Sequence, residues 1–250
     1  MGKTILSFRS FLLLVLIMIT TNSCLSNEKI LILIITGGHD FEEEAFFKMF
    51  KDFEGLEYQL AVQPLANNVY SSDSIDKYDA LVFYDMVQDI SEVQKKAFIA
   101  MLEKGKGLVF LHHSLASYQD WPEFFSIMGG KYLLEPIEKD GQIVAPASDY
   151  NHDMKIPVKV VDKNHPVTKG ISNFVIHDET YGKTITISSI HPLLITNLPS
   201  NGKNIAWANF YKNSRIVYLQ FGHDHFAFEN ANFSKLLKQS IEWVSEKNVK

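Results

Sequence analysis

Short apolar runs, each ending in a polar turn, most strongly limit what this chain can fold into. Lys29–Ile35 leads into Thr36-Gly37-Gly38, and Ala80–Tyr84 and Gly107–Leu111 are runs of the same kind. Strands that are apolar throughout, rather than at alternate positions, are typical of parallel sheets, which are buried on both faces. The sequence therefore predicts that these three runs are neighbouring strands of one largely parallel sheet.

Segments with helical spacing separate these runs. Three candidate helix starts have the capping-box spacing, in which residues three apart satisfy free N–H groups of the first turn. They are Asp40 with Glu43, Ser91 with Gln94, and Asp120 with Glu123. A last helix is predicted where five apolar residues share one face, namely Phe233, Leu236, Leu237, Ile241 and Val244. Strands that alternate with helices favour an open α/β sheet covered on both faces.

Beyond about residue 130 the strands become shorter, because prolines and glycines interrupt the chain. The predicted strands there are Met154–Val161, Phe174–His177, Leu193–Thr196, Asn204–Phe210 and Arg215–Phe221. The last two are predicted to form a hairpin. We find no repeat and no low-complexity linker, so residues 29–246 are expected to form a single domain.

The first 23 residues resemble a signal peptide. Lys3 and Arg9 flank the start of this segment, and an apolar run, Phe11–Ile19, follows. The run has the length of a signal-peptide core and about half that of a membrane-spanning helix. The layout resembles a bacterial lipoprotein signal, in which Cys24 is lipidated and becomes the first mature residue. Thr21 stands where such signals usually carry an aliphatic residue, so a plain secretory signal or an uncleaved anchor remains the alternative.

The cysteine count and the net charge exclude several classes of protein. Cys24 is the only cysteine, so the chain has no internal disulfide and no zinc site built mainly from thiolates. The net charge is −5, whereas nucleic-acid binding needs a basic surface, so we expect no nucleic-acid partner. We expect a protein of the bacterial cell envelope, either periplasmic or an outer-membrane lipoprotein, that meets the membrane only through a lipid anchor.

Histidines follow many of the predicted strands, where open α/β sheets bind ligands. Six of the nine histidines lie there, namely His39, His112, His113, His177, His223 and His225. Neutral imidazole suits zinc and related metals and titrates near neutral pH, so these positions indicate a metal site or an acid–base site. The structural alternative is that each histidine only hydrogen-bonds the backbone.

Two other chemistries fit the sequence less well. Ser114 follows a strand, but the glycines that relieve the turn of a nucleophile elbow are absent around it. Gly37-Gly38 offers backbone N–H groups at a helix start, yet no dinucleotide or Walker pattern is present. The acidic run Glu42-Glu43-Glu44 in the first helical turn would also repel a phosphate.

Six motifs occur in order along the chain. They are Thr36–Asp40, Gly107–Glu123, His165–Gly170, His177–Tyr181, His191–Leu193 and Phe221–Asp224. Together they resemble the ThuA-like (trehalose utilisation) family. The resemblance implies the class I glutamine amidotransferase-like fold, which is a flavodoxin-like α/β/α sandwich with a mostly parallel sheet. It does not imply amidotransferase activity, which uses a cysteine where this chain has His113-Ser114. It associates the chain with sugar catabolism, in particular with keto-derivatives of disaccharides.

The matching motif positions define the predicted pocket, together with their neighbours in sequence. Its predicted catalytic residues are Glu179, His113 and Asp178, and its predicted metal ligands are His112, His223 and His225. The predicted substrate contacts are His39, Tyr118, Trp121 and Asp224. Aromatic rings beside the turn would pack on the C–H faces of a sugar, and the alternative is that they only pack the loop.

We expect an exported enzyme that acts on a sugar or keto-sugar glycoside by isomerisation, elimination or hydrolysis. A base such as Glu179 or His113 would remove the acidic proton next to a ketone, and a divalent metal such as zinc, or an imidazolium, would stabilise the enolate. The rival hypotheses are a non-catalytic carbohydrate-binding lipoprotein and a scaffold domain. Clustering of His39, His113, Glu179 and His223 in one cleft favours the enzyme.

Overall fold

Five parallel strands form the first half of a nine-stranded sheet in this computed structural model, which describes residues 29–246. In spatial order they are β2 (Leu56–Val62), β1 (Ile30–Gly37), β3 (Ala80–Asp85), β4 (Gly107–Leu111) and β13 (Ser214–Leu219). This is the flavodoxin-like strand order, and the predicted fold class is confirmed. The predicted signal peptide and Cys24 lie outside the described residues.

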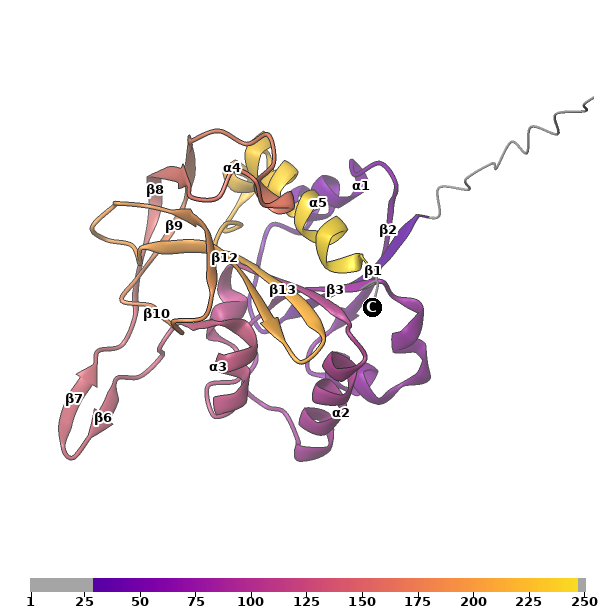
Figure 1. Ribbon diagram of the computed structural model, residues 1–250. Coiled ribbons are helices and arrows are strands. Elements are labelled where there is room, and N and C mark those ends of the chain that lie inside the picture. Colours follow the sequence, from indigo (N-terminus) through magenta and orange to yellow (C-terminus); the bar gives the residue numbers. More distant parts are fainter. Residues whose placement is uncertain (1–28, 247–250) are drawn as a thin grey trace, which may run out of the picture.

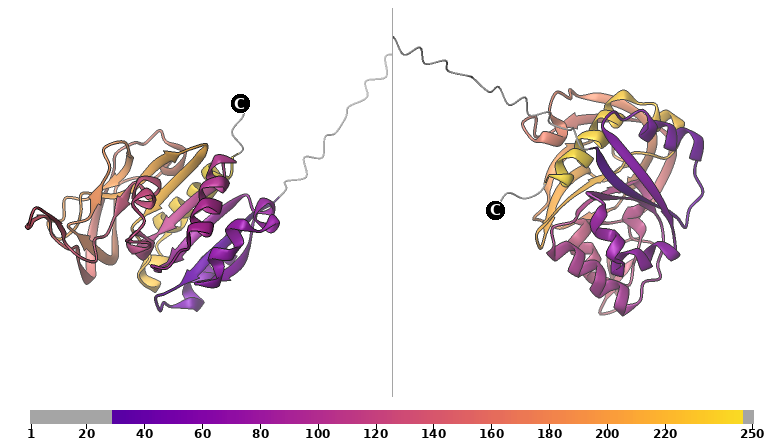
Figure 2. Two further views of the ribbon diagram at one scale, coloured as in Figure 1. Left: turned by 90° about the horizontal axis from the view of Figure 1, so that it is seen from below. Right: turned by 90° about the vertical axis from the view of Figure 1, so that its right-hand side faces the viewer.

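Helices cover both faces of the parallel half, so the molecule has three layers (Figures 1 and 2). Helices α1 (Glu43–Lys51) and α5 (Ala231–Ser245) pack on one face, and α2 (Glu92–Glu103) and α3 (Pro122–Met128) pack on the other. In β1, Ile34 joins the first apolar core and the next residue, Ile35, joins the second. Because successive side chains of a strand point to opposite faces, a strand between two helical layers must be apolar throughout.

One of the three predicted capping boxes is present. At Ser91 the hydroxyl accepts from the Gln94 N–H at 3.3 Å, and the Gln94 side chain accepts from the Ser91 N–H at 2.9 Å. The capping box predicted at Asp40 is wrong, because the N-cap position of α1 is Glu42, whose side chain makes no capping bond and instead accepts from the N–H of His225. The box predicted at Asp120 is also wrong, because Pro122 occupies the first helical position, which it favours, and moves the start by one residue.

The second half of the sheet is antiparallel. It continues from β13 through β12 (Asn204–Tyr211), β11 (His191–Ile195) and β8 (Asp149–Val160) to β9 (Phe174–Gly182). The predicted hairpin between β12 and β13 is confirmed. The strand predicted at Phe174–His177 is too short, because pairing with β8 extends β9 by five further residues. His177, Asp178 and Glu179 therefore lie within β9 and not beyond its end.

Short elements complete the described chain. They are β5 (Gly130–Lys131), β6 (Ile137–Lys139), β7 (Gln142–Ala145), β10 (Ile185–Thr186), α4 (His225–Phe228) and the 3-10 turns Leu65–Ser71, Asp73–Lys77, His112–Ala116 and Pro166–Thr168. The hairpin of β6 and β7 projects from the body of the molecule (Figure 1). Within residues 29–246, no helix has both the length and the apolar character needed to cross a membrane.

Candidate functional site

The carboxyl ends of the parallel strands carry the histidine-bearing turns to one edge of the sheet. His39 follows β1, His113 lies in the turn after β4, and His223 follows β13, which is the parallel neighbour of β4. Strand β9 adds Glu179. These four side chains line one cavity of about 330 Å³. This is the clustering that the enzyme hypothesis requires.

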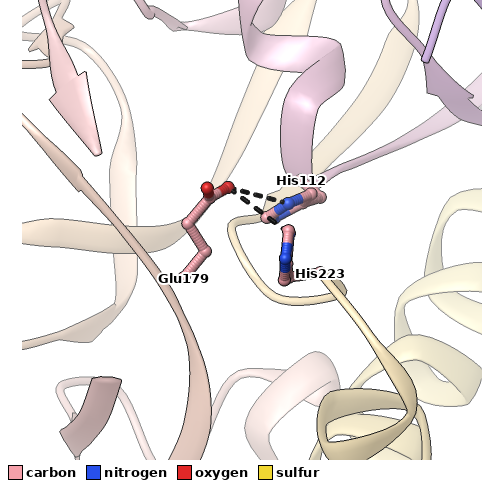
Figure 3. Close-up of side chains that lie close together, drawn as sticks. All are labelled: His112, Glu179 and His223. Atoms are coloured by element: carbon pink, nitrogen blue, oxygen red, sulfur yellow. Dashed lines mark ion pairs between the residues drawn. The ribbon is translucent and has the colours of Figure 1, made fainter. Parts of the chain in front are cut away.

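His112, Glu179 and His223 converge beside this cavity (Figure 3). Oε2 of Glu179 lies 3.2 Å from Nε2 of His112 and 3.7 Å from Nδ1 of His223. Ligand atoms held about 2.0–2.2 Å from one tetrahedral ion lie roughly 3.3–3.6 Å apart. The three donor atoms lie within 4.8 Å of one another, so the group could hold a divalent cation such as zinc. Two imidazoles and one carboxylate also leave coordination positions free for a substrate. The third donor is thus Glu179, where the sequence had predicted His225.

The backbone and the neighbouring side chains fix the orientation of the His112 ring. Its φ of 49° lies in the left-handed region, which is uncommon for a residue with a side chain. Nδ1 lies 2.8 Å from the carbonyl oxygen of Gln220, which can only accept, so Nδ1 carries the proton. Nε2 then points toward Glu179 and lies 3.0 Å from the Tyr181 hydroxyl. A carbonyl partner on the far nitrogen is the usual support of a metal-binding histidine.

Asp178 lies behind the triad and does not line the cavity. Its carboxylate accepts hydrogen bonds from the N–H groups of Gly222, His223 and Glu179 at 2.9, 3.0 and 2.8 Å. Burial raises its pKa to about 6, against the opposing effects of His112 and of these hydrogen bonds. The structure thus gives this predicted catalytic residue a positioning role, because it ties the backbone of Glu179 to that of His223.

The triad histidines and Glu179 shift one another's titration. Burial alone would lower the pKa of His112, but its hydrogen bond to Glu179 and the charges of Asp178 and Glu179 raise it above the ordinary value. Burial would raise the pKa of Glu179, yet His112, His223 and His152 together lower it. Glu179 is therefore a carboxylate at neutral pH, which is the form that binds a metal.

His113 is a buried imidazole at the cavity wall. Only 5% of the residue is exposed, and neither ring nitrogen makes a hydrogen bond of ordinary geometry. Burial, followed by the charges of His112 and His39, holds its pKa well below the usual range, so the ring is neutral at pH 7. Its ring stacks on that of His39, with centroids 4.7 Å apart. A neutral imidazole can take up a proton, and both ring nitrogens of His113 are buried in this structure.

Four of the predicted site residues lie away from the cavity. The buried Tyr118 hydroxyl donates to Asn67 at 2.7 Å, and the Trp121 ring packs against the aromatic core. Asp224 caps α4, because its carboxylate accepts from the N–H of residue 226 at 3.0 Å. Nδ1 of His225 lies 3.0 Å from Oε2 of Glu42. For the two aromatic residues, the loop-packing alternative describes what the structure contains.

Sequence reasoning missed much of the cavity lining. The additional lining residues are Met86, Ala116, Tyr132, Leu134, Tyr150, His152 and Tyr181. Nδ1 of His152 lies only 3.2 Å from Oε1 of Glu179. A register shift between Asn151 and Met154 interrupts the pairing of β8 with β9 at this point. The local pattern of apolar and polar residues does not predict such a shift. The one available signal was a histidine within the polar run Asp149–Asp153.

Comparison with known proteins bears on the fold and the family. Solved structures of ThuA-like proteins from Parabacteroides merdae and Bacteroides uniformis are each 21% identical, with TM-scores of 0.73 and 0.64. The matches cover 87% and 86% of this chain and 90% of each of those chains. A cytoplasmic protein from Salmonella typhimurium is 14% identical with a TM-score of 0.54, over 86% of this chain and 99% of its own.

A search among curated proteins found no match. The family model described as trehalose utilisation matches residues 29–244, which is nearly all of the described chain. The resemblance that was read from the motifs is therefore confirmed, and this chain belongs to the ThuA family.

Proposed function

We propose that this protein is a metal-dependent enzyme of carbohydrate catabolism that acts on a sugar or keto-sugar glycoside. One observation carries the proposal, namely that three donor atoms within 4.8 Å of one another lie beside the cavity that the neutral imidazole of His113 lines. The family description, trehalose utilisation, supports a carbohydrate as the substrate class. Hydrolysis of the same glycoside is a variant of this proposal.

His112, Glu179 and His223 would hold the cation. Bound there, it would supply Lewis acidity that stabilises negative charge on a carbonyl oxygen of the substrate. Glu179 suits this role better than that of the base, because both of its oxygens already face imidazoles. Oε2 faces His112 and His223, and Oε1 faces His152 at 3.2 Å.

His113 is the proposed base. It takes the proton from the carbon next to the ketone, and the electron pair of that C–H bond forms a C=C bond to the carbonyl carbon while the π pair of the C=O bond moves onto the oxygen, which gives an enolate. In an elimination the C=O bond then re-forms, the C=C bond shifts to the carbon that carries the glycosidic oxygen, and that C–O bond breaks. The leaving oxygen keeps the bonding pair and takes up a proton. The exposed His39, which stacks on His113, is placed to supply that proton as an imidazolium. Nδ1 of His39 donates to the carbonyl of Asp40 at 2.6 Å, so the proton would come from Nε2 of the charged ring.

We further propose that the protein works in the bacterial cell envelope, exported by residues 1–23 and anchored through a lipid on Cys24. Its partner would be a small carbohydrate, with the membrane contacted only through that lipid. The rival function is a carbohydrate-binding lipoprotein without turnover. It uses the same cavity, so only an assay separates the two.

The test measures metal content and turnover on the same preparations. Elemental analysis of the purified protein gives the cation, and mass spectrometry follows products from plain and 3-keto disaccharides. We expect about one divalent cation per chain and turnover of the keto substrates. Glu179→Gln should lose both, whereas His113→Asn should keep the cation and lose turnover. His177→Asn, at a half-buried residue outside the cavity, should keep both.

Some results would refute the proposal in part or in full. Undiminished turnover in His113→Asn would remove His113 as the base. A protein that binds the sugars but leaves every substrate of the panel unchanged would be the carbohydrate-binding lipoprotein. A protein that neither binds nor converts these sugars would refute both.

A further inference from the structure

An aromatic row leads from the triad toward the cavity mouth along the end of β9. The ring of Tyr181 stacks on that of His112, with centroids 5.0 Å apart and planes at 28°. The ring of Tyr132 packs edge-on against that of Tyr181, with centroids 5.2 Å apart and planes at 72°. Exposure increases along this row, from the fully buried His112 to the half-buried Tyr132. The row therefore connects the candidate metal site to the outer part of the cavity.

A second aromatic row runs along β8. The ring centroids of His152 and His223 are 4.7 Å apart, and those of Tyr150 and His152 are 5.2 Å apart. Tyr150 is paired with Tyr181 across the two strands, so the two rows are neighbours. Exposure again rises outward, and Tyr150 is 56% exposed.

The outer end of the cavity is apolar. Tyr132, Leu134 and Tyr150 line it, and Leu134 is 41% exposed even though it is a large aliphatic residue. No lysine or arginine is among the lining residues of the described chain, and the inner end carries the Glu179 carboxylate. A phosphate or carboxylate at the outer end would therefore lack a cationic side chain to pair with. An uncharged, planar group with an apolar face fits this surface.

Hydrogen bonds hold this outer end in place before any ligand arrives. The N–H of Leu133 donates to the Ser148 hydroxyl at 2.9 Å, and the N–H of Ser148 donates to the Leu133 carbonyl at 2.8 Å. The two segments that carry Leu134 and Tyr150 are thereby tied together at the base of the projecting hairpin. The N–H of Tyr132 donates to the Leu115 carbonyl at 3.1 Å. A surface that is already ordered loses little entropy when it binds a ligand.

We propose that Tyr132, Leu134 and Tyr150 form a subsite for an uncharged aromatic group attached to the sugar, so that the preferred ligands are aryl glycosides. The inference rests on the proposed function only in placing the sugar ring at the triad. Binding of the aromatic group does not depend on turnover. The competing occupant is a second sugar unit, which would need hydrogen-bond partners for its hydroxyls. Only the Tyr132 and Tyr150 hydroxyls could supply them at this end, because Leu134 offers none.

The test compares binding of phenyl and methyl glucopyranosides by calorimetry, with both anomers, in plain and 3-keto forms, with and without zinc. We expect the phenyl glycoside to bind at least about tenfold more tightly than the methyl glycoside. Leu134→Asp and Tyr150→Ala should reduce that ratio toward one. Val144→Asp is the matched control. Val144 is an exposed aliphatic residue of β7, in the hairpin that follows Leu134, and it does not line the cavity.

Three results would overturn the subsite. They are equal affinities for the two glycosides, no binding of either one, and a ratio that survives Leu134→Asp. Tighter binding of a disaccharide than of the phenyl glycoside would assign the outer end to a second sugar. A high phenyl-to-methyl ratio without turnover of any substrate would support the subsite and count against the proposed enzyme, so the two failures are distinguishable.

Discussion

Oε2 of Glu179 lies 3.2 Å from Nε2 of His112, although the two residues come from opposite halves of the sheet. His112 directly follows the central parallel strand β4, whereas Glu179 lies in the antiparallel strand β9 at the far edge of the sheet. The contact exists because the pair of strands β8 and β9 reaches the carboxyl ends of the parallel strands. Asp178 secures this approach through its hydrogen bonds to residues 222 and 223.

Zinc should stabilise the protein through the triad. A ligand that binds only the folded state at about 100 times its Kd adds roughly 2.7 kcal/mol to the free energy of unfolding. For a domain of this size, that gain corresponds to a rise in Tm of about 5–10 °C. Thermal unfolding followed by circular dichroism should record the rise on adding zinc, and a chelator should reverse it.

The same shift should vanish in variants that lack one donor. Glu179→Gln and His223→Ala each remove one of the three ligand atoms, so zinc should leave their Tm nearly unchanged. His177→Asn should respond like the unaltered protein, because His177 lies outside the triad. A full zinc response in Glu179→Gln would show that the ion binds elsewhere.

Asp178→Ala should destabilise the fold and weaken zinc binding. The substitution leaves three buried N–H groups without their acceptor, and each unpaired group costs about 1–3 kcal/mol. We expect a loss of at least about 3 kcal/mol in the free energy of unfolding measured with urea. Asp224→Ala is the control, because it removes only a helix cap and should cost about 1 kcal/mol. Equal losses in the two variants would contradict the positioning role of Asp178.

The parallel half of the fold was predictable because burial on both faces leaves a local signal. The apolar run Gly107–Leu111 is such a signal, and the histidines after it were rightly placed at the sheet edge. The site was predictable only where such strand ends form it. His152 lies at an irregularity in a strand with many exposed residues, and its approach to Glu179 depends on how β8 and β9 cross the sheet. The spacing of apolar residues within a strand does not predict how two strands cross the sheet.

The same limit explains the residues that were assigned to the site but lie elsewhere. His225 is only two positions beyond His223, yet the chain turns into α4 between them, and the His225 ring then meets Glu42. Tyr118 follows the turn after β4, but its left-handed φ of 49° directs the chain so that its hydroxyl joins a buried polar cluster with Asn67. Proximity in sequence to a true site residue did not fix the direction of either side chain.

Asp85 should make the stability fall as the pH rises. Burial raises the pKa of this carboxyl from 3.8 to about 7, against the hydrogen bond from Gln63. Between these two values the folded state holds a proton that the unfolded state has lost. The free energy of unfolding therefore decreases through that window, by at most about 4 kcal/mol, and is flat above it. Asp85→Asn keeps an acceptor for Gln63 and carries no charge, so it should remove this dependence.

Urea unfolding at pH 5, 6 and 8 checks this prediction. The variant should gain stability relative to the unaltered protein as the pH rises, with the largest difference at pH 8. The quantity to compare is the difference in free energy of unfolding between the two proteins at each pH. Asp178, whose pKa is raised to about 6, makes the stability of both proteins fall with pH in the same way, and the difference removes this effect. If the difference in free energy of unfolding between the two proteins does not change with pH, the raised pKa of Asp85 is contradicted.

Gly38→Ala should disturb the cavity from the turn that carries His39. Gly38 has a φ of +81°, and a Cβ there would lie 2.0 Å from the carbonyl oxygen of Met86, whose side chain lines the cavity. Left-handed strain and the clash with rigid backbone together should cost about 2–5 kcal/mol in the free energy of unfolding. Gly55→Ala is a matched control, because its φ is +80° but nothing lies within 4 Å of the added Cβ. It should cost only about 1–2 kcal/mol. Urea unfolding and calorimetric binding of the phenyl glycoside measure both effects, and equal costs with unchanged binding would contradict the close approach of these two turns.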